Sequence, residues 1–262
     1  MDTQLDGKRA LVTGASSGLG RAIAEAMAAD GATIAVHARS EEKAKDTLDT
    51  IAKAGGNAFA VTGDMATTGE IEAMCKTALD KLGGIDIVVN NAGVYDYMSV
   101  PDMTEEQWDW VIDIDLKAPF LVTKHTLPAL QEQGQGGSLI YIASTNGKTA
   151  DGLFSAYNAA KHGLIGFARC VAHEVGEQAI RSNCICPGWI DTKMAVSFHT
   201  KWSDENKIDY EEFWQESMAN TNMLKRVGEP SDIGDFAVYL ASERGRFITG
   251  QAIYVCGGLC YW

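Results

Sequence analysis

A tyrosine, a lysine and a serine in this sequence are spaced so that they could act together on one substrate oxygen. Tyr157 and Lys161 are four residues apart, which places both side chains on the same face of a helix. Ser144 lies earlier, at the end of an apolar run that predicts a β-strand. A hydroxyl at a strand end and a Tyr/Lys helix face can converge on one oxygen atom. The alternative is a structural role, with Tyr157 half-buried in the helix and Lys161 in solvent.

A glycine-rich segment near the N-terminus could bind a nucleotide. Gly14, Gly18 and Gly20 stand in the sequence TGASSGLG, between an apolar run at residues 9–13 and an alanine-rich helical pattern at residues 20–29. Glycine allows a tight turn and a close approach of phosphate, and the helix start offers unpaired N–H groups and the positive end of its dipole. The spacing is Gly-x-x-x-Gly-x-Gly rather than Gly-x-Gly-x-x-Gly, but the strand–turn–helix context is that of a dinucleotide-binding fold. The alternative is a glycine-rich turn without a ligand.

Charge and composition exclude several classes of partner. The chain has 262 residues with 35 acidic and 22 basic side chains, a formal net charge of −13 at pH 7. Nucleic acids and anionic membranes bind clustered lysine and arginine, so neither is expected as a partner. The N-terminus carries acids where a signal peptide needs positive charge, and no apolar run approaches the roughly 18 residues of a membrane span. The six cysteines form no Cys-x-x-Cys pair and the five histidines no zinc-ligand spacing, so we expect a cytoplasmic protein without a metal site.

Apolar runs of strand length alternate with helical patterns along nearly the whole chain. The predicted strands are residues 9–13, 33–38, 58–62, 85–90, 138–143, 181–185 and 252–255. The predicted helices are residues 20–29, a helix capped by Ser40, and residues 67–82, 104–132, 154–175 and 231–240. Because the strands are continuously apolar, we expect a parallel sheet with helices on both faces. The predicted fold class is α/β, a single doubly wound Rossmann-like domain of about seven parallel strands over residues 1–262.

One stretch breaks this alternation. Residues 193–227 hold Trp202, Tyr210, Phe213 and Trp214 among many charged side chains and show no strand pattern. A long excursion inside a compact domain is usually functional, so we expect residues 193–227 to form a lid over the substrate site.

The chain resembles the short-chain dehydrogenase/reductase family over essentially its whole length. The resemblance is carried by TGASSGLG at 13–20, NNAG at 90–93, Ser144, YNAAK at 157–161, Pro187-Gly188 followed by Thr192, and ITGQ with a later GG between 248 and 258. It implies a Rossmann-like sheet, a nicotinamide cofactor and hydride exchange between an alcohol and a ketone.

Elementary chemistry explains why that reaction needs these residue types. Oxidising an alcohol requires a proton to leave oxygen as hydride leaves carbon, and a tyrosine with a pKa of about 10 is a poor base at neutral pH. A nearby ammonium favours the phenolate and lowers that pKa. We therefore expect Tyr157 as the acid/base and Lys161 as its electrostatic partner and a ligand of the nicotinamide ribose. Ser144 would hydrogen-bond the substrate oxygen and stabilise its developing charge.

The resemblance also implies the cofactor contacts. The glycines would form the pyrophosphate turn, Asp64 would meet the adenine, Asn90 and Gly93 would flank the adenosine ribose, and Thr192 would hold the nicotinamide carboxamide. The expected cofactor-binding residues are Gly14, Ser16, Ser17, Gly18, Leu19, Gly20, Arg39, Ser40, Asp64, Met65, Asn91, Gly93, Tyr157, Lys161, Pro187, Gly188, Ile190 and Thr192.

Two positions depart from the family pattern. Asp115 stands where the family usually has an asparagine that supports a proton relay to the lysine. A relay through the backbone carbonyl would tolerate the change, whereas a relay through the side-chain amide would not. A charged Asp115 would also favour protonated Lys161, so Asp115 is a candidate catalytic residue. Cys256 stands where the family often has aspartate, and we interpret it as structural.

The end of the second predicted strand bears on the choice of cofactor. An acid there would bind the ribose 2′-OH of NAD(H) and repel a 2′-phosphate. This chain has Ala38 at that position, followed by Arg39 and Ser40, which suit a phosphate. NADP(H) is therefore favoured. The alternative is that Arg39 stacks on the adenine, which would serve NAD(H) as well.

The substrate is weakly specified by the sequence. Tyr95, Asn146, Phe154 and Trp189 are candidates for lining the substrate pocket, although large apolar side chains are mostly structural. The mixed charges of residues 193–227 indicate no anion site, so we expect a small neutral alcohol or ketone such as a sugar or polyol. The competing hypotheses are a catalytically weak nucleotide-sensing protein of the same fold and a methyltransferase. A dimer or tetramer is expected, with the apolar tail 259–262 against a neighbouring subunit.

Overall fold

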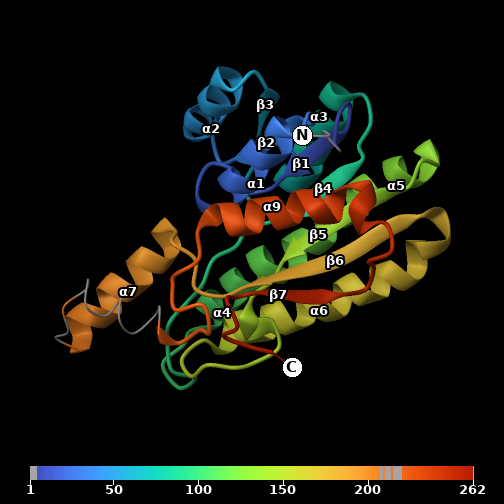
Figure 1. Cartoon of the computed structure of the whole chain (residues 1–262). Coiled ribbons are helices and arrows are strands. Elements are labelled where there is room, and N and C mark those ends of the chain that lie inside the picture. Colours follow the sequence, from blue (N-terminus) through green and yellow to red (C-terminus); the bar gives the residue numbers. More distant parts are fainter. Residues whose placement is uncertain (1–4, 207–208, 210–213, 215–219, 262) are drawn as a thin grey trace.

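Seven parallel strands form one sheet in the computed structural model, which describes residues 5–206, 209, 214 and 220–261 (Figure 1). The strands lie in the order β3-β2-β1-β4-β5-β6-β7. Their bounds are Arg9–Val12 (β1), Thr33–Ala38 (β2), Asn57–Thr62 (β3), Ile87–Asn90 (β4), Gly137–Ile142 (β5), Ile180–Pro187 (β6) and Ala252–Val255 (β7). The predicted strands are thus confirmed, with ends that differ by one or two residues. The chain winds outward from β1 to β3 and then returns to β4 beside β1, so the predicted doubly wound topology is also confirmed.

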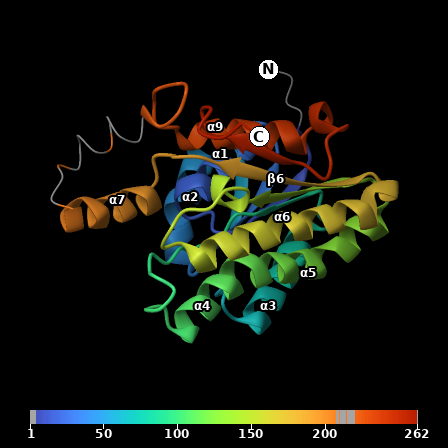
Figure 2. The same cartoon turned by 90° about the horizontal axis from the view of Figure 1, so that it is seen from below.

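Helices cover both faces of this sheet (Figure 2). Their bounds are Gly18–Ala29 (α1), Glu41–Lys53 (α2), Thr68–Leu82 (α3), Glu105–Ile112 (α4), Ala118–Gln133 (α5), Ser155–Val175 (α6), Lys193–Asn206 (α7) and Pro230–Ala241 (α9). Successive strand residues point to opposite faces, so Leu11 packs with α3, α5 and α6 while its neighbour Val12 packs with α1, α2 and α9. Two buried cores result, one on each side of the sheet. Among the described residues no helix is long and apolar enough to cross a membrane.

The stretch expected as one long helix over 104–132 is divided. Thr104 caps α4 through a capping box with Gln107. After α4 the chain forms a π-helical segment, Asp113–Lys117, before α5 begins. Pro119 lies in the first turn of α5 and has no N–H to donate, so a regular hydrogen-bond ladder cannot continue through this point. The π-helical turn holds one extra residue and leaves the Asp115 side chain fully buried.

The connections that follow β4 and β6 at the carboxyl end of the sheet are long. In a doubly wound sheet, ligands bind at these ends, near the point where strand order reverses, which here lies between β1 and β4. The first part of the stretch expected as a lid forms α7, which follows β6 and extends from the body of the molecule (Figure 1). Tyr210 and Phe213 lie outside the described residues. Trp214 is described and is buried.

Candidate active site

The three side chains expected to act on one oxygen come together at the carboxyl end of β5. Ser144 follows this strand and caps a 3₁₀ turn, its Oγ accepting a hydrogen bond from the Asn146 N–H at 3.1 Å. Tyr157 and Lys161 lie in the first turns of α6. The Lys161 ammonium donates to the carbonyl of Ile142, the last residue of β5, at 3.1 Å. Tyr157 is half-buried, as the alternative expected, but Lys161 is buried, so the part of the alternative that placed Lys161 in solvent is wrong.

Asp115 forms a buried ion pair with this lysine. Its Oδ2 lies 2.9 Å from the Lys161 Nζ, and the two side chains are 0% and 5% exposed. Its Oδ1 accepts a hydrogen bond from the Val94 N–H at 2.7 Å, which fixes the carboxylate against the loop after β4. Gly93 packs against the pair, since a Cβ at that position would stand 3.3 Å from the carboxylate and 3.4 Å from the ammonium. The departure from the family pattern therefore places a carboxyl group directly on the lysine. Burial raises the pKa of Asp115, whereas the Lys161 charge and the Val94 hydrogen bond lower it and favour the ionised form.

Burial and these charges together decide the proton affinity of the tyrosine. Burial raises the pKa of Tyr157, Lys161 lowers it, Asp115 raises it and the Ser144 hydroxyl lowers it, with Cys186 raising it further. The lysine acts in the expected direction, but burial and Asp115 outweigh it, so the pKa of Tyr157 lies above its usual value. Burial lowers the pKa of Lys161, but the charge and hydrogen bond of Asp115, together with Tyr157 and Cys184, raise it by more, so the pKa of Lys161 is also raised. The site therefore holds a neutral phenol beside a charged lysine at neutral pH.

The glycine-rich turn adjoins this group across the end of β1. Gly14 has φ +64°, and a Cβ there would lie 2.9 Å from the Ala92 Cα, so the position requires glycine. Asn91 donates its amide N–H to the carbonyls of Thr13 at 2.8 Å and Gly14 at 3.2 Å, which ties the turn to the end of β4. Ser17, the N-cap of α1, makes no side-chain cap hydrogen bond to the described residues, so the N–H groups of the first turn stay available to an anion.

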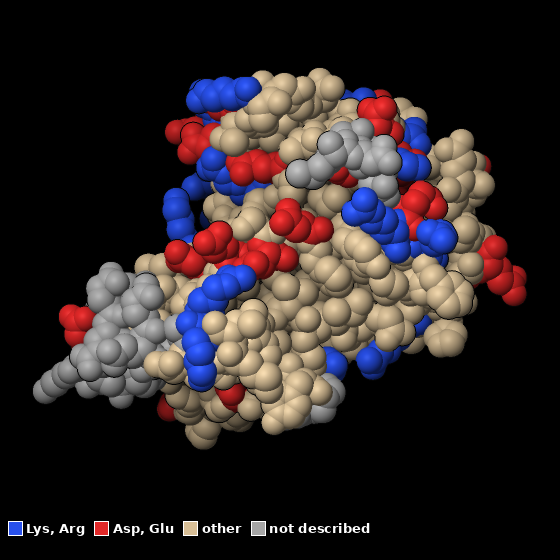
Figure 3. Space-filling view, viewed as in Figure 1, with Lys and Arg blue, Asp and Glu red and all other residues tan. Residues whose placement is uncertain are grey.

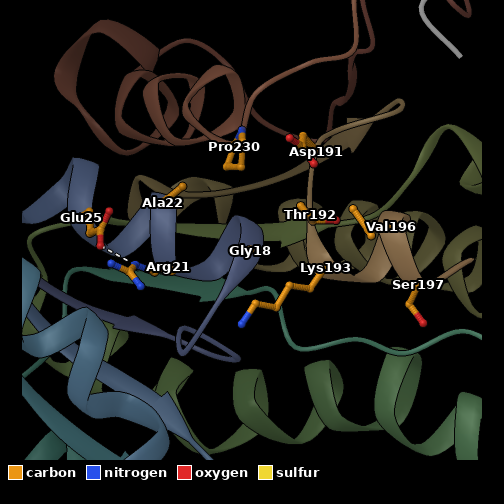
Figure 4. Close-up of a pocket in the computed structure, with 10 residues that line it drawn as sticks. All are labelled: Gly18, Arg21, Ala22, Glu25, Asp191, Thr192, Lys193, Val196, Ser197 and Pro230. Atoms are coloured by element: carbon orange, nitrogen blue, oxygen red, sulfur yellow. Dashed lines mark hydrogen bonds and ion pairs between the residues drawn. The ribbon is translucent and has the colours of Figure 1, made fainter. Parts of the chain in front are cut away.

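A cleft of about 600 Å³ continues from this turn (Figure 4). It lies between the start of α1 and the connection from β6 into α7, and Lys193 extends from the start of α7 toward the side where Gly18 and Arg21 lie. The Arg21 Nε pairs with a Glu25 oxygen at 2.7 Å. The residues that line it are Gly18, Arg21, Ala22, Glu25, Asp191, Thr192, Lys193, Val196, Ser197 and Pro230. Two of these, Gly18 and Thr192, were expected cofactor residues, and the structure places them next to each other.

The residues present fit a bound nucleotide. The turn approaches Ala92 too closely for any side chain at Gly14, and the start of α1 is uncapped by Ser17. Asn90 ends β4 with its amide 2% exposed, and neither polar atom of that amide has a hydrogen-bond partner among the described residues. A buried amide without a partner is costly unless a ligand group or water satisfies it.

Comparison with known proteins agrees with this geometry. A family model described as enoyl-(acyl carrier protein) reductase matches residues 14–260. The human dehydrogenase/reductase SDR family member 4 is 36% identical over 97% of this chain and 88% of its own length. The D-beta-hydroxybutyrate dehydrogenase of Cupriavidus necator is 37% identical over 97% of this chain and 98% of its own. A crystal structure from Sinorhizobium meliloti, described as a short-chain alcohol dehydrogenase, superposes with a TM-score of 0.90 at 35% identity, covering 99% of this chain and 98% of that one.

The chain belongs to the short-chain dehydrogenase/reductase family. The predicted family is thus confirmed, as is its Rossmann-like fold.

No acid stands at the end of β2 in this dehydrogenase/reductase. Ala38 is buried there, and the exposed Arg39 and the α2 cap Ser40 follow it. Asp64 is exposed in the loop after β3, where its Oδ1 accepts from the Ala66 N–H at 2.9 Å. Met65, also expected at the cofactor, has its side chain buried in the core.

One residue that sequence reasoning missed connects these segments. His37 of β2 is 2% exposed, and its ring nitrogens contact the Gly14 N–H and the Gly63 carbonyl, each at 3.0 Å. The available signal was a polar ring inside an otherwise apolar strand, next to the residues that bear on the choice of cofactor.

The remaining cofactor candidates lie after β6. A Cβ at Gly188 would lie 2.8 Å from the Cβ of Cys256, so the cysteine packs against the Pro187-Gly188 turn. Ile190 is buried, and it forms a backbone bridge with Gly228. Cys256 also accepts a hydrogen bond from the Cys260 N–H at 3.4 Å, which agrees with a structural role.

Aromatic side chains gather beside Tyr157. The ring of Phe154 lies 6.3 Å from that of Tyr157, 5.2 Å from Tyr97 and 6.3 Å from Tyr95, centre to centre. One of the four substrate candidates, Phe154, is therefore close to the phenol, and another, Tyr95, packs on Phe154. Asn146 meets Ser144 through its backbone, and Trp189 follows β6, its carbonyl accepting from the Gly228 N–H at 2.9 Å.

Proposed function

We propose that this short-chain dehydrogenase/reductase transfers a hydride between NADP(H) and a small alcohol or ketone, with Tyr157 as the acid/base. The observation that carries the proposal is the convergence of Ser144, Tyr157 and buried Lys161 at the carboxyl end of β5, beside the glycine-rich turn. A hydroxyl donor, a phenol and an ammonium in one place are what proton transfer to a carbonyl oxygen requires.

The proposed mechanism follows from the charges around the phenol. A bound nicotinamide would supply the hydride for reduction and accept it in oxidation. In reduction, Ser144 hydrogen-bonds the carbonyl oxygen and the Tyr157 O–H gives its proton to that oxygen as the hydride reaches carbon. The phenolate that remains is stabilised by the Lys161 ammonium, which Asp115 keeps protonated. Oxidation of the alcohol runs through the same steps in reverse.

Several residues would hold the cofactor. We propose that the turn of Gly14, Gly18 and Gly20, the first N–H groups of α1, and Thr192 bind the pyrophosphate and nicotinamide end. The buried Asn90 amide and Gly93 would lie at the adenosine ribose. Arg39 and Ser40, with no acid at Ala38, favour a 2′-phosphate and hence NADP(H) over NAD(H).

The proposed substrate is a small neutral compound. The ring of Phe154 lies beside the phenol and packs with the rings of Tyr95 and Tyr97, and the apolar face of a sugar, polyol or other hydroxy compound can pack on these rings. The stretch 193–227 is proposed as a lid, of which residues 193–206, 209, 214 and 220–227 are described.

We also propose a homodimer or homotetramer in the cytoplasm. The sheet ends at the edge strand β7, and Figure 3 shows few charged side chains over β6 and β7. A second apolar surface lies on α4 and α5, where Trp108, Trp110 and Phe120 are 38%, 44% and 44% exposed. In the tail, Tyr261 is 70% exposed. Such surfaces favour self-association, and the six free cysteines fit a reducing compartment.

Turnover of a substrate panel with each nicotinamide tests the proposal. Alcohols and ketones are screened by the change in absorbance of NADPH and, separately, NADH. Tyr157→Phe removes the proton donor and keeps the ring, so it should abolish turnover while NADPH still binds. Full activity in this variant would refute the role of Tyr157. Nucleotide binding without turnover of any substrate by the unmodified protein would instead favour the nucleotide-sensing alternative.

A further inference from the structure

A buried imidazole joins three segments of the nucleotide cleft. His37 lies on β2, between β1 and β3 in the sheet, near the carboxyl ends of all three strands. The Gly14 N–H, in the turn after β1, donates to its Nδ1 at 3.0 Å. Its Nε2 meets the carbonyl of Gly63, just after β3, at 3.0 Å. The His37 carbonyl accepts from the Ala15 N–H at 2.8 Å, so backbone and side chain of one residue hold two successive amides of the turn.

These contacts require one form of the ring. A backbone N–H can only donate, so Nδ1 must be unprotonated; a carbonyl can only accept, so Nε2 must carry the hydrogen. Only the neutral Nε2–H tautomer satisfies both partners. A protonated ring would turn a second N–H toward the Gly14 amide, and the two donors would push the turn away from β2.

The surroundings bear on that protonation. Burial lowers the pKa of His37, while the Gly63 carbonyl and the negative charge of Asp64 in the same loop raise it. The glycine-rich turn brings no titratable side chain, and α2 reaches this turn through Thr47, whose hydroxyl donates to the Ala15 carbonyl at 2.9 Å. Asp64 is thus the charged neighbour that acts on the ring within the described residues, and the neutral form prevails at neutral pH.

We propose that His37 is a positioning residue for the cofactor, which as a neutral imidazole sets the glycine-rich turn for binding and whose protonation weakens that binding. The inference rests on the proposed nucleotide function. The inference also gives Gly14 and the residues after it different roles in cofactor binding. The Gly14 amide is engaged by His37, so Gly14 contributes its left-handed conformation, and contacts to phosphate fall to the N–H groups that follow it at the start of α1.

Binding of NADPH to the full chain, measured by fluorescence between about pH 8 and about pH 5, tests this role. His37→Asn keeps an acceptor near Gly14 that does not titrate, and His37→Leu removes both polar contacts. At pH 8 the Leu variant should bind NADPH about tenfold more weakly, the effect of one lost hydrogen bond, while the Asn variant keeps most of the affinity. Toward pH 5 the affinity of the unmodified protein for NADPH should fall by up to about tenfold per pH unit below the pKa of His37, and the affinity of the Asn variant should fall less.

Two controls isolate the imidazole. The 2′-phosphate of NADPH titrates in the same range, but it does so in every variant, so only the difference between variants reports on His37. His173→Gln changes an exposed histidine in α6 and should leave the profile unchanged. In His37→Leu the KM for NADPH should rise more than kcat falls, because the change acts on cofactor binding rather than on Tyr157.

Two results would overturn the proposal. One is a His37→Asn variant whose affinity for NADPH falls toward acid as steeply as that of the unmodified protein. The other is a His37→Leu variant that binds NADPH as tightly as the unmodified protein at pH 8. Should the variants fail to fold, ¹⁵N NMR of the unmodified protein reads the ring directly. The proposal requires the Nε2–H tautomer and, by linkage, a lower His37 pKa when NADPH is bound; an Nδ1–H ring or an unchanged pKa would refute it. If the protein binds neither NADPH nor NADH at any pH, the proposed function fails instead.

Discussion

Replacing Asp115 with asparagine should move the pH–rate profile of this enzyme toward acid. Asn is nearly the same size and keeps an oxygen that can accept the 2.7 Å hydrogen bond from the Val94 N–H, so the backbone contact is retained. What is lost is the negative charge beside Lys161, one of the groups that raise the pKa of Tyr157.

The size of the effect can be bounded from the structure. The carboxylate oxygen lies 2.9 Å from the Lys161 Nζ, which lies 5.4 Å from the centre of the Tyr157 ring. The carboxylate is therefore at most about 8 Å from the ring centre, and at an effective dielectric constant of about 20 a charge at that distance contributes about 2 kcal/mol. Because about 1.4 kcal/mol corresponds to one pH unit, the apparent pKa of Tyr157 should fall by about 1.5 pH units in Asp115→Asn.

The assay is kcat/KM for oxidation of an alcohol as a function of pH. This quantity rises with pH as Tyr157 loses its proton in the free enzyme. The rising limb should lie about 1.5 pH units lower in Asp115→Asn than in the unmodified enzyme.

Asp113→Asn is the matched control. Asp113 lies in the same π-helical segment but pairs with exposed Lys117 at 3.0 Å, so its limb should not move. A limb that stays in place in Asp115→Asn, or that moves to higher pH, would refute the view that Asp115 acts on Tyr157 through charge.

Further predictions concern cofactor choice, the turn and stability. Arg39→Asp should raise KM for NADPH by about tenfold or more and improve use of NADH, measured as the ratio of the two kcat/KM values, because the new carboxylate repels a 2′-phosphate. Gly20→Ala should abolish NADPH binding, since its Cβ would collide with the Gly14 carbonyl and the Asn91 amide, whereas Gly69→Ala, with nothing within 4 Å, should bind normally in the same titration. Asp86→Asn should lower the free energy of unfolding in urea by about 2 kcal/mol at pH 7, because it breaks the Asp86 pair with Arg9. Burial raises the pKa of Asp86, but the hydrogen bonds from Arg9 lower it more. This stabilisation is therefore present above the usual carboxyl pKa of about 4 and is lost as the pH falls below it. An Asp86→Asn variant whose free energy of unfolding falls toward acid as much as that of the unmodified protein would contradict this account.

The fold followed from patterns that are local in the sequence. Each strand needed only a short apolar run, and the alternation of runs with helical periods determined the parallel doubly wound sheet. The convergence of Ser144 with Tyr157 and Lys161 was also predictable, because the end of β5 and the first turns of α6 are joined by a short connection. The glycine positions predicted the turn after β1, because left-handed conformations and close contacts there exclude other residues.

Tertiary structure decided the electrostatics of the site. The contact of Asp115 with Lys161 depends on a π-helical turn, and a regular helical period over 104–132 does not contain that extra residue. In the sequence, His37 is one more residue of a predicted strand. Its contacts with Gly14 and Gly63 arise only because β1 and β3 lie on either side of β2 in the sheet. A sequence specifies backbone conformation through nearby residues, whereas burial and charge at one atom are sums over side chains from distant segments. For this reason the sequence alone predicted the position of the Tyr157 phenol, whereas its pKa depends on the tertiary structure.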